Sequence, residues 1–356
     1  MAQEADTSLT TAEMKRLSIE QLMTVEIVSV SKWNDKLGTT ASAVQIITAE
    51  DIRRAGATSV PEALRLADNL HVAQKNSHDW AISARGFNTD LANKLLVLID
   101  GRSVYTPLFS GVFWDRQDYL LADIDHIEII SGPGGTLWGS NAVNGVINII
   151  TKKSGDTKGL YAEAGGGTWL RSFAGMRWGG QIGNKGSVRV YAKYFDRLES
   201  MYPDEHKASD AWHMTQGGFR YDARMSEQDM ITVQGDYYNG REGLSSGGVS
   251  DAIGGNVTAN WTHTSSDRSD MNLLAYYDRT KLKNPVPSLE TNGMELAPAG
   301  TLKDDLHTYN MDFQHRIRIR EHNRFIWGLG YRYMHDVVSN APALAFEPEA
   351  LDRNPV

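Results

Sequence analysis

Residues 132–151 read GPGGTLWGSNAVNGVINIIT, a glycine-rich turn followed by an apolar, β-branched strand. The glycines at 132, 134 and 135 are expected to serve backbone conformation, because glycine adopts positive φ angles at little steric cost. A phosphate-binding loop is excluded, since no Gly-Lys-Ser/Thr follows them. The stretch therefore predicts a tight turn that leads into a buried strand.

The sequence before this strand mixes strand and helix signals. Two apolar runs, Leu95–Ile99 and Ile127–Ile130, predict further buried strands, and Asp100-Gly101 is a strong hairpin turn signal. Two helices are expected to open at Thr48 and Ser59, which are favoured N-cap residues followed by acidic ones. These elements together predict a small α+β domain.

The chain changes character after this domain, which we place at residues 32–153. From residue 158 to residue 356 almost every segment alternates between apolar and polar residues, the pattern of strands with one face of each kind. Phe325, Trp327 and Leu329, for example, share one face of a strand. The second region therefore predicts about nine antiparallel strands.

The connections between these strands are expected to alternate in length. Short turns are predicted near residues 183–186, 225–228, 265–268 and 321–323, and long polar connections at 198–210, 241–254 and 284–303. Outer-membrane barrels have tight turns at one end and long loops at the other. The predicted fold class is thus an α+β domain followed by the antiparallel strands of a transmembrane β-barrel.

This barrel is expected to be partial. An even number of strands is the rule, and the last residues, Pro355 and Val356, fall within an expected loop. A free edge in lipid would leave backbone groups unpaired, so we expect a truncated barrel. The alternative is a soluble β-rich binding protein, in which Trp261, Phe313 and Trp327 would be covered.

The composition of the chain excludes several classes of function. Lys and Arg number 36 against 44 Asp and Glu, a net charge of -8 that argues against nucleic acid as a partner. The chain has no cysteine, which excludes disulfides and thiolate metal sites. Its mean hydropathy of -0.40 and the lack of a long apolar run exclude a membrane helix. Recognisable catalytic motifs are missing, so we expect no enzyme and no cofactor.

Several motifs in order resemble the TonB-dependent receptor family. They are Ser42–Ile52, Pro61–Leu64, Ala81–Phe87, Leu95–Tyr105, Ile127–Ile129 and the Gly132–Thr151 stretch. The resemblance covers nearly all of residues 25–153 and identifies the α+β domain as a plug. It implies an importer of the bacterial outer membrane, whose plug fills a lipid-embedded barrel. It also implies that the partner TonB supplies energy from the inner membrane.

The resemblance further implies a TonB box, a short segment that TonB captures. The candidate is residues 25–31, and within it Glu26, Ile27, Val28, Ser29, Val30 and Ser31, preceded by a periplasmic segment at 1–24. A short β-branched segment can add as an edge strand to a partner sheet, where main-chain hydrogen bonds give the affinity. The alternative is that these residues are simply the first strand of the plug.

Arg85, in Ala84-Arg85-Gly86-Phe87, resembles the plug arginine that pairs with barrel carboxylates in the family. Such a buried ion pair would act as a latch, since removal of one partner costs about 3–5 kcal/mol. The family usually places a second arginine before Gly-Pro, but this chain has Ser131 there. We therefore expect a single plug latch, at Arg85.

Ligand contacts are expected from two plug loops rich in aromatic residues. The candidates are His78, Asp79, Trp80, Tyr105, Phe109, Phe113, Trp114 and Asp115. Aromatic rings beside a few polar groups suit a bulky chelate, although the same rings can instead pack the plug against its barrel. His78 and Asp79 are adjacent, which does not suit a metal site, so no resident metal is expected.

The leading functional hypothesis is uptake of a ferric siderophore or a similar large, scarce ligand. A cobalamin importer on the same machinery is a close alternative, and an importer of carbohydrate or another metal is a third. The plug motifs are common to all of these and do not discriminate between them.

Overall fold

The computed structural model describes residues 26–27, 35–36, 43–86, 88–91, 93–132, 138–320 and 323–353. The chain divides into two compact units. Unit 1 comprises Met1–Lys75 and Asp79–Lys152, and unit 2 comprises Asn76–His78 and Lys153–Val356. Within the described part of the chain, no helix is both long and apolar enough to cross a membrane.

Unit 1 is built on a mixed five-stranded sheet in the order β3-β8-β9-β6-β7. Its strands are β3 (Ala43–Thr48), β6 (Leu95–Ile99), β7 (Arg102–Ser103), β8 (Ile124–Ser131) and β9 (Gly145–Thr151). All neighbours are antiparallel except β6 and β9, which run parallel. A separate hairpin pairs β4 (Leu70–Gln74) with β5 (Trp80–Ala84).

The predicted turn and helix starts are present. Asp100 and Gly101 have φ angles of 48° and 84°, the positive pair of a tight hairpin turn, between β6 and β7. Helix α3 (Ala49–Ala55) begins with a complete capping box, in which Thr48 and Asp51 each accept the other's backbone N–H. These local signals fix where the chain bends.

Helix α4 (Val60–Leu64) departs from the predicted capping box in one respect. The Ser59 side chain accepts the Glu62 N–H, as expected. The Glu62 carboxylate, however, accepts the backbone N–H of Thr58, one residue before the cap, at 2.7 Å. Both bonds still satisfy donors at the start of the helix, so the helix begins where the sequence indicated.

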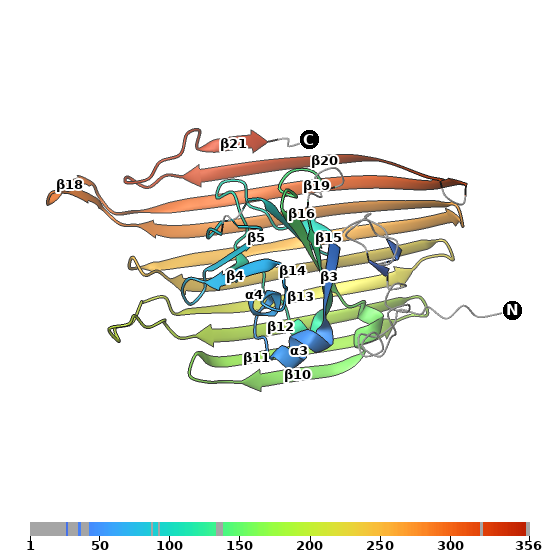
Figure 1. Cartoon of the computed structure of the whole chain (residues 1–356), viewed down its shortest axis with the longest axis horizontal. Helices are drawn as coiled ribbons and strands as arrows, with labels where there is room; N and C mark the ends of the chain where they lie inside the picture. Colours follow the sequence, from blue (N-terminus) through green and yellow to red (C-terminus); the bar gives the residue numbers. More distant parts are fainter. Residues whose placement is uncertain are drawn as a thin grey trace. The chain divides into compact units, whose positions relative to one another are not determined.

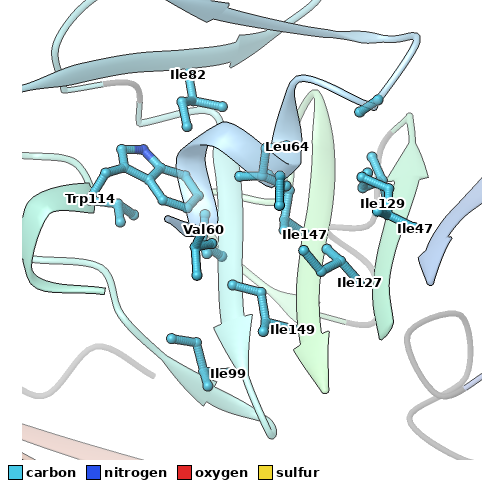
Figure 2. Close-up of a cluster of buried hydrophobic side chains, with 14 of the residues drawn as sticks. Ile47, Val60, Leu64, Ile82, Ile99, Trp114, Ile127, Ile129, Ile147 and Ile149 are labelled. Carbon is cyan, nitrogen blue, oxygen red and sulfur yellow. The ribbon is translucent and has the colours of Figure 1, made fainter. Parts of the chain in front are cut away.

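The core of unit 1 lies where α4 packs on the sheet. Figure 2 shows Val60 and Leu64 beside the isoleucines of the strands, among them Ile127, Ile147 and Ile149. Each of these five side chains is fully buried. Burial of one such side chain stabilises the fold by roughly 1.5–3 kcal/mol, so this cluster is a major source of the unit's stability.

Unit 2 is an antiparallel sheet of ten strands that follow one another in chain order (Figure 1). They are β10 (Gly159–Gly165), β11 (Leu170–Ile182), β12 (Gly186–Arg197), β13 (Trp212–Arg224), β14 (Asp229–Gly243), β15 (Val249–Ser266), β16 (Ser269–Val286), β19 (Gly300–Arg320), β20 (Asn323–Ser339) and β21 (Ala350–Arg353). The sequence predicted about nine; the tenth is the four-residue β21. The 3-10 helix η4 (Ser154–Thr157) is attached to this sheet by Ser154, whose backbone N–H and hydroxyl both donate to Asp222.

Connections at the two ends of this sheet differ, as predicted. At one end, the turn end, residues 183–185, 225–228 and 267–268 join consecutive strands. At the other, the loop end, residues 198–211 form a long connection. The predicted long connections at 241–254 and 284–303 were wrong in extent, because the strands continue into both.

The reason for this error is that ladder hydrogen bonds do not depend on side-chain polarity. β14 and β15 pair up to Gly243 and Val249, which leaves a connection of residues 244–248 only. Beyond β16, the hairpin of β17 (Leu289–Thr291) and β18 (Met294–Ala297) lies in the middle of the expected loop, and β16 and β19 take up its two ends (Figure 1). The polar stretches are therefore strand extensions beyond the apolar part of the sheet.

The two faces of the sheet have opposite character. In cross-strand register, Trp178, Val190 and Phe219 form part of one row, and Phe313 and Leu329 part of another. This face, the apolar face, is exposed: Leu329 is 73% accessible. The predicted alternation is confirmed, and the apolar side chains of these strands lie on an exposed face.

The opposite, polar face carries charged and amide side chains in the same register. Arg189 lies opposite Arg220, and Arg220 lies opposite Gln234, whose Oε1 accepts from Arg220 at 3.1 Å. Tyr191 donates to Asp236 at 2.6 Å. An apolar exposed face combined with a polar hydrogen-bonded face is the reverse of a water-soluble sheet.

Candidate functional site

A three-residue segment of unit 2, Asn76–His78, is hydrogen-bonded to the loop end of the sheet. The backbone N–H of Ser77 donates to Asp210 Oδ2 at 2.8 Å, and the Ser77 hydroxyl donates to the Leu198 carbonyl at 3.0 Å. The Trp212 indole N–H donates to the Ser77 carbonyl at 2.9 Å. We call this arrangement the Ser77 junction.

Asp210 is the centre of the Ser77 junction. It is fully buried, and it also accepts the Ser200 N–H and the Ser200 hydroxyl, both at 2.6 Å. Burial alone would raise the pKa of Asp210, but the hydrogen bonds from Ser200 and from the Ser77 backbone outweigh it, and the pKa is lowered. The carboxylate therefore stays ionised and joins two connections that are distant in sequence.

His78 completes the junction. Its Nε2 lies 2.9 Å from the Gly243 carbonyl, so Nε2 carries the proton and donates. Its ring meets Trp212 edge-on at 6.1 Å. Of the predicted ligand residues, His78 is thus held by the sheet, with its ring buried.

An aromatic cluster lies beside the junction on the polar face. Its buried members are Phe195, Trp212, Met214 and Tyr238. Phe195 and Trp212 pack edge-on at 4.6 Å, and the guanidinium of Arg197 lies 5.7 Å from the Phe195 ring centroid. Sequence reasoning did not select these residues, because alternate aromatic residues in a strand indicate only a packed face.

The second predicted loop, Tyr105 to Asp115, contains a half-buried part and a buried part. Phe109 and Phe113 are half-buried and meet edge-on at 5.1 Å, and Tyr105 is also half-buried. Trp114 and Asp115, in the 3-10 helix η2 (Trp114–Arg116), are buried. The structure therefore separates the five predicted residues of this loop into an accessible trio and a buried pair.

Arg116 holds these two parts together. Its guanidinium lies 3.9 Å from the centroid of the Phe113 ring and 3.3 Å from the Asp115 carboxylate. A buried arginine that faces a ring and a carboxylate fixes the orientation of both. Phe113 is thus presented from a rigid base.

The remaining residues of the first loop have separate surroundings. Trp80 is buried in β5, with the Arg65 guanidinium 4.9 Å from its ring. Asp79 is half-buried, and its carbonyl accepts the Lys75 N–H at 2.9 Å. Among the described residues, no group of three or more His, Asp or Glu side chains is arranged to hold a metal ion.

A buried ionic cluster in the unit 1 sheet was missed by sequence reasoning. His126 lies 2.6 Å from Asp125 and 3.2 Å from Glu128, and Asn148 contacts Glu128 at 3.5 Å. Burial lowers the pKa of His126, but the bonds to Asp125 and Glu128 outweigh it and raise the pKa to about 9. His126 is therefore charged at neutral pH and compensates the fully buried Glu128.

Comparison with known proteins identifies unit 1. Residues 36–146 match the family model described as TonB-dependent Receptor Plug Domain. Residues 36–146 are thus similar to the plug domain of TonB-dependent receptors. The expected resemblance to TonB-dependent receptors and the expected fold class, an α+β plug followed by antiparallel strands, are thereby confirmed.

Relatives and solved structures agree with the plug assignment. The chain is 32% identical over 166 residues to the vitamin B12 transporter BtuB of Vibrio cholerae serotype O1, which covers 46% of this chain and 26% of the transporter. The chain thus matches about a quarter of that relative's length.

Two solved receptors share the fold at low identity. The pyoverdine outer membrane receptor FpvA of Pseudomonas aeruginosa PAO1 has a TM-score of 0.73 at 14% identity, over 92% of this chain and 51% of that one. The ferric-catecholate import receptor Fiu of E. coli K12 has a TM-score of 0.65 at 14% identity, over 89% of this chain and 52% of that one. At this identity the likeness shows the plug and strand fold alone.

The predicted latch residue lies at a strained turn of the plug. Arg85 is exposed and has a φ of 58°, and its Nη2 stands 3.7 Å from the position that a Cβ on Gly132 would take. Ser131, where a second arginine was expected, accepts a hydrogen bond from Asn69. Asn144 donates to the Ala84 carbonyl at 3.0 Å and so holds the turn in place.

The candidate TonB box is only partly within the described residues of the plug. Glu26 and Ile27 form strand β1 (Glu26–Ile27), which pairs antiparallel with β2 (Asp35–Lys36). Val28, Ser29, Val30 and Ser31 lie outside the described residues, as does the predicted periplasmic segment at 1–24. Phe87 of the Arg85 motif also lies outside them.

Proposed function

We propose that this chain is the plug and part of the barrel wall of an outer-membrane transporter that takes up a ferric siderophore or a similar large, scarce ligand. The plug-domain match at residues 36–146 is the observation that carries this proposal. The relatives reported above are a transporter and two receptors, not enzymes. The function is accordingly transport rather than catalysis.

The exposed apolar face supports a position in the bacterial outer membrane. Leu329 and Met311 are 73% and 53% accessible on neighbouring strands, a large exposure for water-soluble sheets. A transmembrane strand needs about 9–11 residues, and β19 has 21. The strands are thus long enough to cross the bilayer and to project beyond it at the loop end.

Energy coupling requires a partner, because the outer membrane holds no useful potential. We assign residues 25–31, including Glu26 to Ser31, as the TonB box that the partner TonB captures. The pairing of Glu26 and Ile27 with β2 supports this role, since these two residues are extended and make strand pairing. Capture by TonB would replace this short internal pairing with a pairing to the partner.

The ligand-contacting residues are assigned from accessibility. Tyr105, Phe109 and Phe113 are half-buried and offer aromatic surface on a rigid base, which suits a bulky chelate. His78, Trp80, Trp114 and Asp115 are buried and engaged in packing or hydrogen bonds. We therefore propose that the accessible trio contacts the ligand, that Asp79 lies at its margin, and that the buried four support the loops.

Arg85 is proposed as the latch that a barrel carboxylate holds. Its exposure leaves the guanidinium accessible to such a partner, and its positive φ is a strained state that surrounding structure must maintain. Asn144 supplies part of that support through its bond to Ala84. Release of the latch would then relax the turn that follows β5.

The test is ligand-dependent uptake by a strain that lacks the native gene and carries the full-length one. Cells supplied with one ferric siderophore at a time are expected to accumulate iron only when both the gene and TonB are present. Failure to take up any siderophore or cobalamin, with normal outer-membrane insertion, would reject the transport function.

The TonB box is tested by proline, which removes the N–H that strand addition needs. Ile27→Pro and Val28→Pro are expected to abolish uptake while surface binding of the ligand persists. Ala12→Pro, in the preceding segment, is the matched control and should leave uptake unchanged. Persistent uptake in both variants would reject residues 25–31 as the TonB box.

A cobalamin importer is the second candidate. The identity of 32% over 166 residues to a vitamin B12 transporter favours it, whereas the solved siderophore receptors are 14% identical. The same cells grown with cobalamin as the limiting nutrient separate the two, because each ligand is supplied alone.

A further inference from the structure

The polar face of the unit 2 sheet is divided by charge. Five successive cross-strand rows run from the row of Arg197, at the loop end, to the row of Arg189. In these rows, β12 and β13 contribute four basic side chains and no acidic one, namely Arg189, Lys193, Arg197 and Arg220. The strands from β14 to β20 contribute five carboxylates and one cation to the same rows, namely Asp236, Glu242, Asp278, Asp304, Asp336 and Arg332. The face thus has a cationic strip on β12 and β13 and an acidic strip on β14 to β20.

Two further carboxylates lie beside the cationic strip. Asp222, one row beyond Arg220, accepts from the Nε of that arginine at 3.0 Å. Glu163 of β10 accepts from Tyr161 at 2.7 Å, and it is offset by Arg177 of β11, whose guanidinium lies 5.0 Å from the Tyr161 ring. The remaining cations, all on β12, have no carboxylate directly opposite them on β11 or β13. We call these three residues, Arg189, Lys193 and Arg197, the cationic column.

Aromatic rings alternate with the cations of the column. Tyr191 and Phe195 lie between them on the same face of β12, so the face reads Arg-Tyr-Lys-Phe-Arg. The Lys193 ammonium and the Arg197 guanidinium lie 5.8 and 5.7 Å from the centroid of the Phe195 ring, within the range of a cation–π contact. A ligand that leaves one cation therefore meets a ring before it reaches the next.

The column lies at the depth of the apolar band. On the opposite face of β12, Val190 and Tyr194 are 42% and 38% exposed, on the side proposed to contact lipid. Ionisable side chains at membrane depth are costly, and they commonly line a pathway for a substrate or an ion. From Arg189 to Arg197 the column spans about 27 Å of strand, or about 20 Å in height at the usual tilt of barrel strands. It therefore extends over most of a hydrocarbon core of about 30 Å.

The spacing of the column suits stepwise movement rather than one tight site. Successive cations are four residues apart, which is about 14 Å along an extended strand. A small chelate therefore contacts one cation at a time. Conduction requires binding that is strong enough for entry and weak enough for release, and several separate sites provide this. The acidic strip repels an anion, so it confines an anionic ligand to the side of β12 and β13.

We propose that the cationic column guides a metal chelate of net negative charge from the loop end towards the turn end. This inference rests on the proposed transport function and narrows its substrate class. The three cations are 3–7% exposed, so the column is closed to solvent in this arrangement and opens only when the groups that cover it move. An uncharged ligand would gain no attraction from the column, and a cationic ligand would be drawn to the acidic strip instead.

The test uses the complete protein in the outer membrane of cells that lack the native gene. Arg189→Gln/Lys193→Gln removes two cations of the column, and Arg189→Lys/Lys193→Arg keeps both charges while it exchanges the side chains. Asp304→Asn/Asp336→Asn, which removes two carboxylates of the acidic strip, is the second control. Outer-membrane insertion is measured for every variant, and Lys193→Gln alone replaces the double variant if that variant is not inserted.

Uptake and surface binding are measured for anionic ferric catecholate and carboxylate chelates and for uncharged cyanocobalamin. We expect the parent protein to take up an anionic chelate. The variant that lacks the two cations should take it up roughly tenfold more slowly, because the local concentration of an anion depends on the field of the column. Its surface binding of the chelate should be unchanged. The charge-keeping variant should match the parent rate, and the Asp304/Asp336 variant should be no slower than the parent.

An uptake rate equal to that of the parent in the variant without the two cations would overturn the proposal. Equal slowing in the charge-keeping variant would also overturn it, because side-chain shape rather than charge would then control the rate. A parent protein that takes up only cyanocobalamin would refute the column and leave the transport function standing. A parent protein that is inserted normally and takes up none of these compounds would refute the transport function itself.

Discussion

The plug and the strand region place their apolar side chains in opposite ways. In the plug, Ile147 is fully buried beneath α4, whereas in the sheet Leu329 is 73% accessible. The polar groups are reversed as well, since Glu128 is buried in the plug sheet and compensated by His126. One chain thus follows the rule of a protein that folds in water and then the rule of one that folds in lipid.

The difference teaches that a strand pattern alone does not indicate whether the strand is surrounded by water or by lipid. Both regions contain β-branched and aromatic strands, but the plug strands β6 and β9 are apolar on both faces and the sheet strands on one. What separates them is which face the tertiary structure covers. Substitutions that act in one environment and not the other therefore test the comparison directly.

The largest effect is expected in the plug core. Ile147→Ala should lower the free energy of unfolding of the plug by about 2–5 kcal/mol, because a fully buried side chain leaves a cavity. Val143→Ala, at an exposed position four residues earlier, is the control and should change it little. Thermal unfolding of both variants measures the difference, and similar melting temperatures would contradict the assigned core.

A charge on the apolar face is expected to act nearly as strongly, but only in lipid. Leu329→Arg should destabilise the folded protein in bilayers by about 2–4 kcal/mol, the usual cost of a cation at the membrane midplane. Leu289→Arg introduces the same change in the β17–β18 hairpin, beyond the apolar band, and should be tolerated. Equal folding yields of the two variants in liposomes would place Leu329 outside the bilayer.

The Ser77 junction is expected to depend on one carboxylate. Asp210→Asn replaces one of the two accepting carboxylate oxygens with an NH2 donor, so that one of the Ser77 and Ser200 N–H groups loses its acceptor, at a cost of about 1–3 kcal/mol. Hydrogen exchange at these two amides should accelerate accordingly. Asp204→Asn, in the same connection but exposed, is the control. Unchanged protection of Ser77 would show that Asp210 does not hold the segment.

The effect that is smallest at neutral pH is a pH dependence in the plug. Because the folded pKa of His126 is raised from 6.5 to about 9, its contribution is complete below pH 6.5 and is lost as the pH rises through 9. Relative to His126→Gln, the parent plug should lose roughly 3 kcal/mol across this window, since one pKa unit corresponds to about 1.4 kcal/mol. His71→Gln, at an exposed position of β4, should keep the parent profile. A parent and a His126 variant with the same pH profile would contradict the buried charge.

The sequence predicted most of the local structure of both regions. Thr48, Ser59 and the Asp100-Gly101 pair mark element boundaries through hydrogen bonds and φ angles that involve only nearby residues. The alternation in the strands likewise assigned Phe325, Trp327 and Leu329 to one face before any pairing was known. The ordered plug motifs indicated the family from residues 25–153 alone.

The candidate site was less predictable, because its residues meet across long separations. Asp210 lies near the end of a polar connection and belongs to no recognisable sequence motif, and its partner Ser77 is 133 residues away. His78 was selected as a ligand residue beside Trp80, yet the structure places its Nε2 against the Gly243 carbonyl. The ends of the second and third long connections were also misjudged, because strand pairing continued through polar residues.

The sequence by itself determined the helix caps, the hairpin turn, the strand periodicity and the resemblance to the plug domain, all of which depend on neighbouring residues or on motif order. Only the tertiary structure decided that β6 pairs parallel with β9, that Asp210 holds Ser77, and that the lysines at 283 and 303 face each other. The physical reason is that cross-strand register and buried polar contacts arise from backbone pairing between distant segments, and no local propensity encodes that pairing.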